Sequence, residues 1–186
     1  AGCQGVRIGV ESGNERLRQE ILKKRMSNAE ILAAGRLVQK HGMEIRTCNM
    51  IGVPGETPAM IDETIELNRA LNPSDLQFSV FYPYPMTELH DLCEREGYIQ
   101  EGTTLPSYYG RQSVLRLPTL STAELAAAYD RFAALRNELV LRRHSPRRYQ
   151  LRRLALRLAG GDPARLERWL RPLRALRRLA RRARAN

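Results

Sequence analysis

The stretch Gly52-Val53-Pro54-Gly55 is the clearest sign of chemistry in this sequence, because it follows the apolar pair Met50-Ile51 and precedes a helix start. Its glycines allow backbone angles and close approaches that side chains forbid, and its proline stiffens the turn. Thr57-Pro58 then supplies a helix cap and a first helical residue. Such a turn exposes backbone N–H and C=O groups to a ligand, although a tight connection without a ligand has the same sequence pattern.

Two further strands are expected to end in turns of this kind. Val6–Val10 alternates apolar and other residues and stops at Glu11-Ser12, while Leu76–Tyr82 stops at Pro83. An acidic side chain therefore stands at the end of the first strand. Three strands, each followed by a helix, predict an α/β fold with parallel strands, crossover connections and a site at the carboxyl ends of the strands.

The number of βα units predicts a partial (βα) barrel of the TIM type. A closed eight-unit barrel needs about 250 residues, whereas this chain of 186 residues holds only three or four such units. The first strand starts close to Ala1, and we expect the chain to be part of a longer protein. Its 42% hydrophobic content is enough for a core. No apolar run reaches the roughly 18 residues of a membrane span.

Periodicity and turn residues divide the chain into three expected segments. These are a βα region at 1–99, a loop-rich connector at 100–120, and a helical, arginine-rich extension at 121–186. A capping-box pattern from Ser121 to Glu124 marks the first helix of the extension. The expected helices lie near residues 14–24, 28–41, 57–71, 87–97 and 121–143.

The cysteines are scattered along the chain. Cys3, Cys48 and Cys93 form neither a short metal-ligand spacing nor a disulfide framework. Free cysteines of this kind are usually buried core thiols, although three of them can still converge on a metal in space. We therefore assign no metal ligand and expect a reducing, cytoplasmic compartment.

Positive charge is concentrated in residues 142–186. This segment holds 16 arginines, no lysine and two acidic residues, a balance of +14, so the total of +11 leaves −3 for residues 1–141. Two helices are expected here, with apolar residues on one side and arginines at the other positions. The apolar positions are Leu151, Leu154, Ala155 and Leu158 in the first helix, and Leu166, Trp169, Leu170, Leu173 and Leu176 in the second.

Basic amphipathic helices suit an anionic membrane surface, the phosphates of a nucleic acid or an acidic protein. The simplest alternative is a solvated arginine face on helices that pack against another part of the protein. Membrane binding through residues 142–186 would make the protein peripheral to a membrane. Nucleic acid is less favoured, because only 6% of the residues are aromatic and can stack on bases.

Four motifs, taken in order, resemble the second half of a radical S-adenosylmethionine (SAM) enzyme core, over about residues 1–99. The resemblance is closest to the subgroup that places a cobalamin (B12)-binding domain before the radical domain. The methylthiotransferases are also similar, but they usually carry Gln at the position of Glu11. The motifs are Ile8-Gly9-Val10-Glu11-Ser12-Gly13-Asn14-Glu15-Arg16-Leu17, Lys24-Arg25-Met26-Ser27, Asn49–Thr57 and Phe81–Thr87.

This resemblance implies roles for particular residues. Glu11, with Ser12 beside it, would contact SAM through the ribose hydroxyls or the methionyl ammonium. Arg25, or the adjacent Lys24, would meet the methionyl carboxylate. Helix capping by Glu11 and a surface ion pair of Arg25 are the structural alternatives. Backbone would lie against the adenine at Ile51 and Gly52.

One motif of the family is absent from this sequence. The family holds its [4Fe–4S] cluster with a Cys-x-x-x-Cys-x-x-Cys loop, and no such loop occurs here. The resemblance therefore implies that the protein binds SAM and an iron–sulfur cluster whose ligands lie outside this chain. It also implies a cobalamin-binding domain outside this chain, and whether the enzyme uses cobalamin stays open. We expect the cysteine loop roughly 80–110 residues upstream, in the missing amino-terminal part of the same protein. Alone, the chain should bind SAM weakly and turn nothing over.

The reaction and the substrate stay open at this point. Methyl transfer, cyclisation and rearrangement are all compatible with the motifs, and the expected substrate is a small molecule or a lipid. Other functions remain: a methylthiotransferase-like enzyme acting on RNA or protein, a non-catalytic basic nucleic-acid-binding module, or a small phosphate-binding domain. The last lacks the Lys-Ser/Thr of a P-loop and the spacing of a dinucleotide fingerprint.

Overall fold

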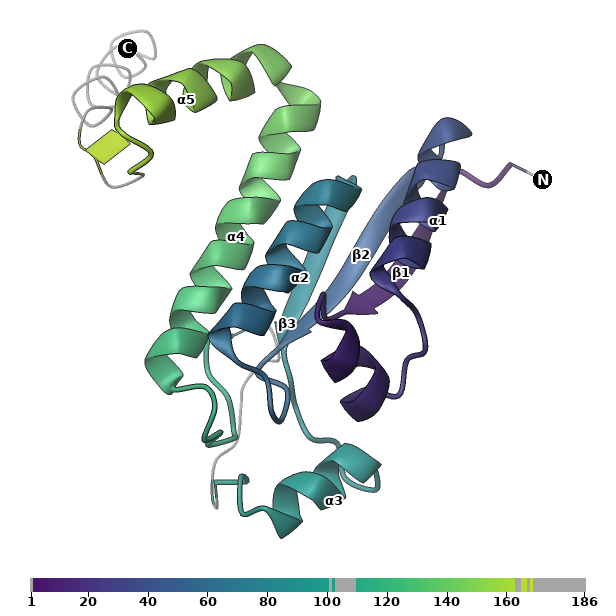
Figure 1. The fold of residues 1–186 in the computed structure, drawn as a ribbon, viewed down its shortest axis with the longest axis vertical. Coiled ribbons are helices and arrows are strands. Elements are labelled where there is room, and N and C mark those ends of the chain that lie inside the picture. The colour runs from purple at the N-terminus through teal and green to yellow at the C-terminus, as the bar shows by residue number, and fades with distance from the viewer. Residues whose placement is uncertain (1, 101, 103–109, 163–164, 167, 169–186) are drawn as a thin grey trace, which may run out of the picture. The chain divides into compact units, whose positions relative to one another are not determined.

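The computed structural model describes residues 2–100, 102, 110–162, 165, 166 and 168. Strands and helices alternate through its first half (Figure 1). The chain divides into two compact units, residues 1–140 and residues 141–186. The strands are β1 (Gly5–Glu11), β2 (Glu44–Ile51) and β3 (Asp75–Val80), and the helices are η1 (Leu17–Ile21), α1 (Asn28–Lys40), α2 (Pro58–Leu71), α3 (Glu88–Arg95), α4 (Thr122–His144) and α5 (Pro146–Leu158).

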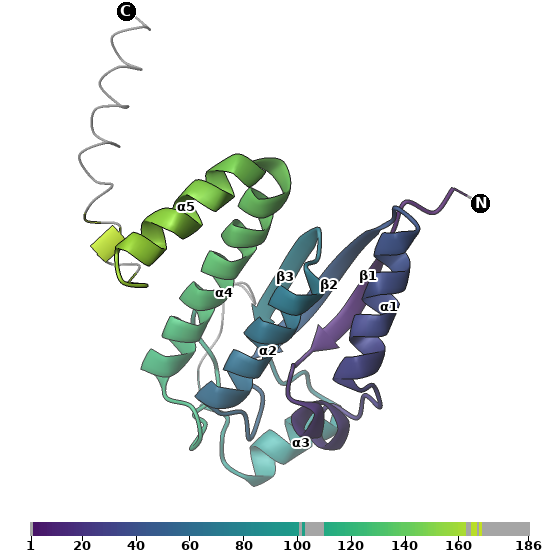
Figure 2. The same cartoon turned by 45° about the horizontal axis from the view of Figure 1, so that its top comes forward.

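The three strands form one parallel sheet in the order β1-β2-β3. Helices follow each strand, so the predicted α/β arrangement of βα units is confirmed and is consistent with part of a βα barrel. The carboxyl ends of the strands point to the same edge of the sheet, and η1 and α3 lie beyond that edge (Figures 1 and 2). This carboxyl edge is where the sequence places its candidate site.

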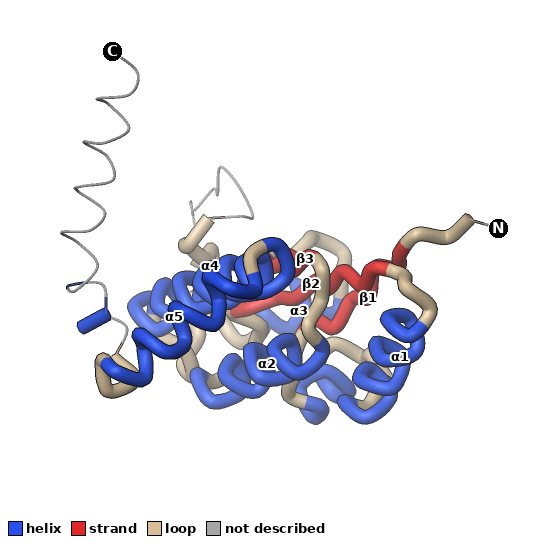
Figure 3. Tube along the Cα trace, turned by 90° about the horizontal axis from the view of Figure 1, so that it is seen from above, coloured by secondary structure: helices blue, strands red, loops and turns tan. Residues whose placement is uncertain are grey.

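The sheet buries one face against helices. In β2, the residues Ile45, Thr47, Asn49 and Ile51 are buried, while those between them are exposed or half-buried. The helices α1 and α2 lie on this buried face (Figure 3). Buried leucines of α4 share a core cluster with β3 and α2. The alternation of the strand residues thus fixes which face the helices cover.

Four of the expected helices match α1, α2, α3 and α4 closely, but the helix expected at 14–24 is different. The chain is helical there only at residues 15–21, mostly as the short π-helix η1. Its start is fixed by Asn14, whose side-chain oxygen accepts from the Leu17 N–H at 2.9 Å. Its end is fixed by Lys23, which has a φ of +55° and turns the chain out of the helix. Lys24 and Arg25 therefore lie in a loop before α1.

The connector and the extension are described in part. Residues 101 and 103–109 of the expected connector lie outside the described residues, and Leu117 and Leu120 form an isolated antiparallel bridge further along it. The first helix expected in the arginine-rich segment corresponds to α5, and the second lies mostly outside the described residues. Within the ranges that the structure describes, no helix is both long and apolar enough to cross a membrane.

Candidate functional site

β1 ends in a bulge that redirects Glu11. The pairing register with β2 is regular as far as Gly9, which lies opposite Cys48. The register then shifts past Val10, so that Glu11 lies opposite Asn49. Glu11 has a φ of +62°, in the left-handed region that strains a residue with a side chain. Bulges and strained residues are common beside functional sites. The structure therefore places Glu11 at the carboxyl edge on an unusual stretch of backbone.

Glu11 forms an ion pair with Lys24 at this edge. The Lys24 Nζ atom lies 2.7 Å from Glu11 Oε1 and also donates to the Gly9 carbonyl oxygen at 3.1 Å. The Lys24 and Glu11 side chains are 40% and 18% exposed, so the pair is reachable from solvent. A Cβ atom on Gly9 would clash with both charged groups, and glycine leaves the space that they occupy. The pair presents a carboxylate and an ammonium side by side.

The other predicted residues around β1 lie in different surroundings. Arg25 is exposed, so the basic residue that the structure brings to Glu11 is Lys24. Ser12 is fully buried. Its Oγ atom accepts from the Asn14 N–H at 3.2 Å and lies 3.5 Å from Thr64 Oγ1 of α2. Ser12 thus fastens the turn after β1 to α2.

A buried arginine holds the loop that carries Lys24. Arg18 is 0% exposed. Its guanidinium donates to the Ser12 carbonyl oxygen at 2.5 Å and to the Met26 carbonyl oxygen at 2.9 and 2.6 Å. A fourth hydrogen bond, of 2.9 Å, reaches Asn28 Oδ1 at the start of α1. Arg18 therefore ties the end of β1 to the start of α1, with Lys24 in between.

The turn after β2 has the form that its glycines predict. Gly52 has a φ of +80°, and a Cβ atom there would lie 3.2 Å from Leu125 of α4. The Gly52 N–H donates to Glu56 Oε2 at 2.6 Å, and the Ile51 carbonyl oxygen accepts from the Phe81 N–H at 2.8 Å. Both predicted residues lie at the carboxyl edge. Because these two backbone groups are bonded within the chain, a ligand would use other groups of the turn.

Glu56 is a buried carboxylate that lies within the motif Asn49–Thr57 but received no role from it. It is 0% exposed, and its Oε2 accepts from the Gly52 and Val53 N–H groups at 2.6 and 3.4 Å. Its Oε1 is the buried side-chain atom that has no hydrogen-bond partner among the described residues. Burial raises the pKa of Glu56 to about 7, against the two N–H donors, which favour the charged form. The sequence feature that could have indicated this buried carboxylate is its position, four residues after Gly52.

The backbone of Glu56 joins this turn to the segment before α4. Its carbonyl oxygen accepts from Thr119 Oγ1 at 2.7 Å. Contacts of this kind come from residues far apart in sequence, so no local pattern predicts them. They hold the glycine turn in one conformation at the edge of the sheet.

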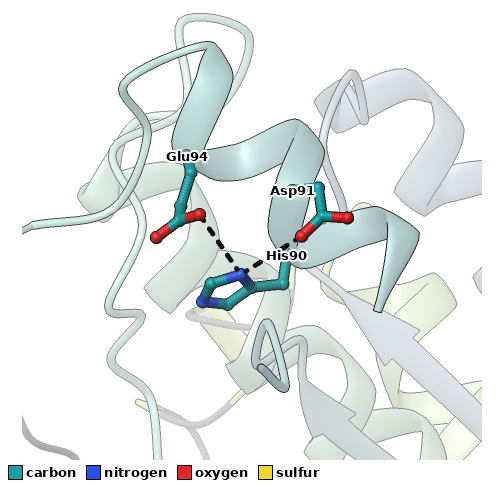
Figure 4. A group of neighbouring side chains, drawn as sticks. All are labelled: His90, Asp91 and Glu94. Atoms are coloured by element: carbon teal, nitrogen blue, oxygen red, sulfur yellow. Dashed lines mark ion pairs between the residues drawn. The ribbon is translucent and has the colours of Figure 1, made fainter. Parts of the chain in front are cut away.

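α3 carries three side chains of metal-ligand type. His90 Nδ1 lies 3.8 Å from Asp91 Oδ1 and 3.7 Å from Glu94 Oε2 (Figure 4). The two carboxylates are 71% and 64% exposed, and exposed acidic groups are common without an ion. In the part of the chain that the structure describes, no other trio of such side chains is close enough to share an ion. We assign no metal to this cluster.

The three cysteines do not belong to that cluster. Cys3 is exposed, Cys48 is half-buried and Cys93 is buried. Burial raises the pKa of the Cys93 thiol to about 11, and it also raises the pKa of Cys48. Thiols with a raised pKa are less often the thiolates that bind metals. The structure thus gives these cysteines no shared ligand role.

Comparison with known proteins points to the same part of the chain. Residues 1–67 match the family model of the radical SAM superfamily. A protein of Pyrococcus horikoshii named an uncharacterized methyltransferase is 31% identical over 88 residues, which cover 47% of this chain and 19% of that protein. This chain therefore spans about a fifth of the length of that relative. The matched family region contains Glu11, Lys24 and the turn at Gly52.

Proposed function

We propose that this chain is the carboxyl-terminal part of a radical SAM iron–sulfur enzyme of the cobalamin-binding subgroup, and that it contributes contacts to SAM and substrate. The observation that carries the proposal is the Glu11–Lys24 pair at the carboxyl edge of a parallel sheet. Ligands of parallel α/β sheets bind at this edge. The match of residues 1–67 to the radical SAM superfamily supports the proposal.

The residues present fit the amino-acid end of SAM. Its ammonium and carboxylate form a zwitterion, for which Glu11 offers an acceptor and Lys24 offers donors. Because Gly9 has no side chain, the Glu11 carboxylate and the Lys24 ammonium can both lie over it at the edge of the sheet. In this proposal Ser12 supports the turn, and Arg25 is the second candidate for the methionyl carboxylate. The backbone at Ile51 and Gly52 is the proposed neighbour of the adenine, through groups other than the Ile51 carbonyl oxygen and the Gly52 N–H, which are bonded within the chain.

The iron–sulfur cluster and cobalamin are proposed to bind in other parts of the protein. The cysteines described here do not gather into a cluster site, so the cluster ligands would lie outside this chain. When bound, such a cluster supplies the electron for the cleavage of SAM. We favour methyl transfer to a small molecule or lipid, because the Pyrococcus relative is named a methyltransferase.

Glu11→Gln and Lys24→Gln should each weaken SAM binding by about 1–3 kcal/mol, roughly 5- to 150-fold, because each removes a charge-assisted hydrogen bond to the zwitterion. Saturation-transfer NMR of this chain with SAM can measure a weak affinity. Arg25→Gln belongs in the same series, and a smaller loss is expected because Arg25 is exposed.

The matched control for this series is the ion pair of Glu44 and Arg46. Its 3.0 Å separation is similar, but it lies at the start of β2, on the amino edge of the same sheet. Glu44→Gln and Arg46→Gln should leave SAM binding unchanged. If the two pairs lose affinity equally, or if neither does, the proposed site is wrong.

Gly9→Ala should weaken SAM binding while the chain stays folded. The added methyl group would meet the ends of Glu11 and Lys24, which are flexible side chains that can swing away. We expect about a tenfold loss of affinity, with a change in unfolding free energy below about 1 kcal/mol. The same NMR titration and a thermal melt followed by circular dichroism measure the two effects.

Gly13→Ala gives the contrast to Gly9→Ala. Its methyl group would meet the backbone of α2 at Glu63 and Thr64, 2.5 Å away, so the fold itself should lose stability. An unchanged SAM affinity in Gly9→Ala would mean that the Glu11–Lys24 arrangement is not needed for binding.

A further inference from the structure

Helix α5 presents a stripe of exposed leucines. Leu151, Leu154 and Leu158 are 66%, 55% and 69% exposed. Their spacing of three and four residues places them on one side of the helix. No residue of α5, which the structure describes in full, is buried. A single exposed leucine is ordinary, whereas three in one row form a continuous apolar surface that gains from being covered.

Arginines flank this leucine stripe. At about 100° of rotation per residue, Arg148 and Arg157 lie roughly a quarter turn to either side of the stripe. The helix contains three more arginines and no acidic residue. Arg153 lies over the Tyr149 ring, 5.8 Å from its centroid. The helix therefore combines an apolar row with cationic borders.

We propose that α5 binds an anionic membrane surface, with the leucine stripe entering the boundary of the acyl chains and the flanking arginines contacting lipid phosphates. Two observations select this partner. The net charge of +14 in residues 142–186 favours a polyanion. The leucine stripe favours a partner with an apolar layer next to its phosphates, which a lipid surface offers and a nucleic acid does not. Long arginine side chains reach the headgroups while their stems lie along the apolar layer.

The proposal is independent of SAM binding, because it involves only the unit of residues 141–186. Its site residues, Leu151, Leu154 and Leu158, lie outside the segment that matches the radical SAM family. Failure of one proposal would therefore leave the other intact. A membrane-bound protein of this kind would meet a lipid substrate at the surface on which it sits.

The first test measures co-sedimentation of the whole chain with vesicles. Vesicles of phosphatidylcholine with about one quarter phosphatidylglycerol should bind the chain at least tenfold more tightly than pure phosphatidylcholine. The triple variant Leu151→Gln, Leu154→Gln, Leu158→Gln should lower the partition coefficient by about 100-fold, because the apolar row is lost while every arginine remains. Leu37→Gln is the matched control, since Leu37 on α1 is similarly exposed, at 58%, and should change nothing.

The second test separates lipid from nucleic acid. Arg148→Gln with Arg157→Gln should lower binding to anionic vesicles by about 30-fold, from roughly 1 kcal/mol for each basic residue near the surface. The leucine variant should still bind single-stranded polyuridylate as well as the wild type does, because phosphates contact only arginines. The proposal is overturned if vesicle binding is absent, or if it survives loss of the three leucines. Circular dichroism of each variant checks that the helix content is kept.

Discussion

Replacing Arg18 with methionine is expected to lower the free energy of unfolding by about 3–5 kcal/mol, the largest effect of one residue that we expect in this chain. Methionine fills a similar volume but has no donors. The Ser12 and Met26 carbonyl oxygens and Asn28 Oδ1 would lose their buried donor. Each unsatisfied acceptor costs about 1–3 kcal/mol. Part of this is offset because burial of the guanidinium, which lowers the pKa of Arg18, is itself unfavourable.

Urea unfolding followed by circular dichroism measures this loss. Arg16→Met is the matched control, because Arg16 is two residues away, its side chain is 78% exposed, and its ion pair is with the exposed Glu20 at 3.0 Å. The control should cost less than about 1 kcal/mol. If Arg18→Met is as stable as Arg16→Met, the buried hydrogen bonds contribute no net stability and the loop before α1 is held by other contacts.

The parallel α/β fold could be predicted because its signals are local. The alternation in Val6–Val10 and the glycine turn after Ile51 mark strand ends without knowledge of any distant residue. Thr57 and Thr87 mark helix starts, and in the structure their side chains accept from the N–H groups three residues later. Strand order then follows from the crossover rule for βα units.

The partner of Glu11 could not be predicted, because it depends on the path of a loop. The sequence predicts a helix near residues 14–24, yet the helix ends at Ile21, and Lys23 then adopts a φ of +55°. That early exit brings Lys24 to Glu11 and leaves Arg25 exposed. Sequence spacing does not distinguish two adjacent basic residues, whereas the loop conformation does.

The buried polar contacts between β2 and α2 could not be predicted from sequence patterns either. Thr47 and Asn49 occupy buried positions of β2, where apolar residues are the usual choice. Asn68 of α2 accepts from the Thr47 hydroxyl at 2.8 Å and donates to Asn49 Oδ1 at 2.7 Å. Buried polar groups are stable only when they are paired in this way. The pairing forms because α2 packs against β2, so neither segment predicts it by its own sequence.

The free energy of unfolding should fall by up to about 3 kcal/mol as the pH rises from about 5 to 8, because of Glu56. Its pKa is about 7 in the folded chain, above the ordinary value of 4.5 that applies when it is unfolded. The folded state therefore binds this proton more tightly. The stabilisation is complete below the unfolded pKa and is lost as the pH rises through the folded pKa.

Glu56→Gln should remove this pH dependence, because the amide oxygen can still accept from the Gly52 N–H while nothing titrates. Glu88→Gln, at an exposed carboxyl group in the first turn of α3, is the control and should keep the slope. Glu56→Ala should lower stability at every pH, since the Gly52 and Val53 N–H groups lose their acceptor. Urea unfolding at each pH measures all three variants. A slope that persists in Glu56→Gln would assign the tightly held proton to another group and leave Glu56 only the hydrogen bonds that close the glycine turn.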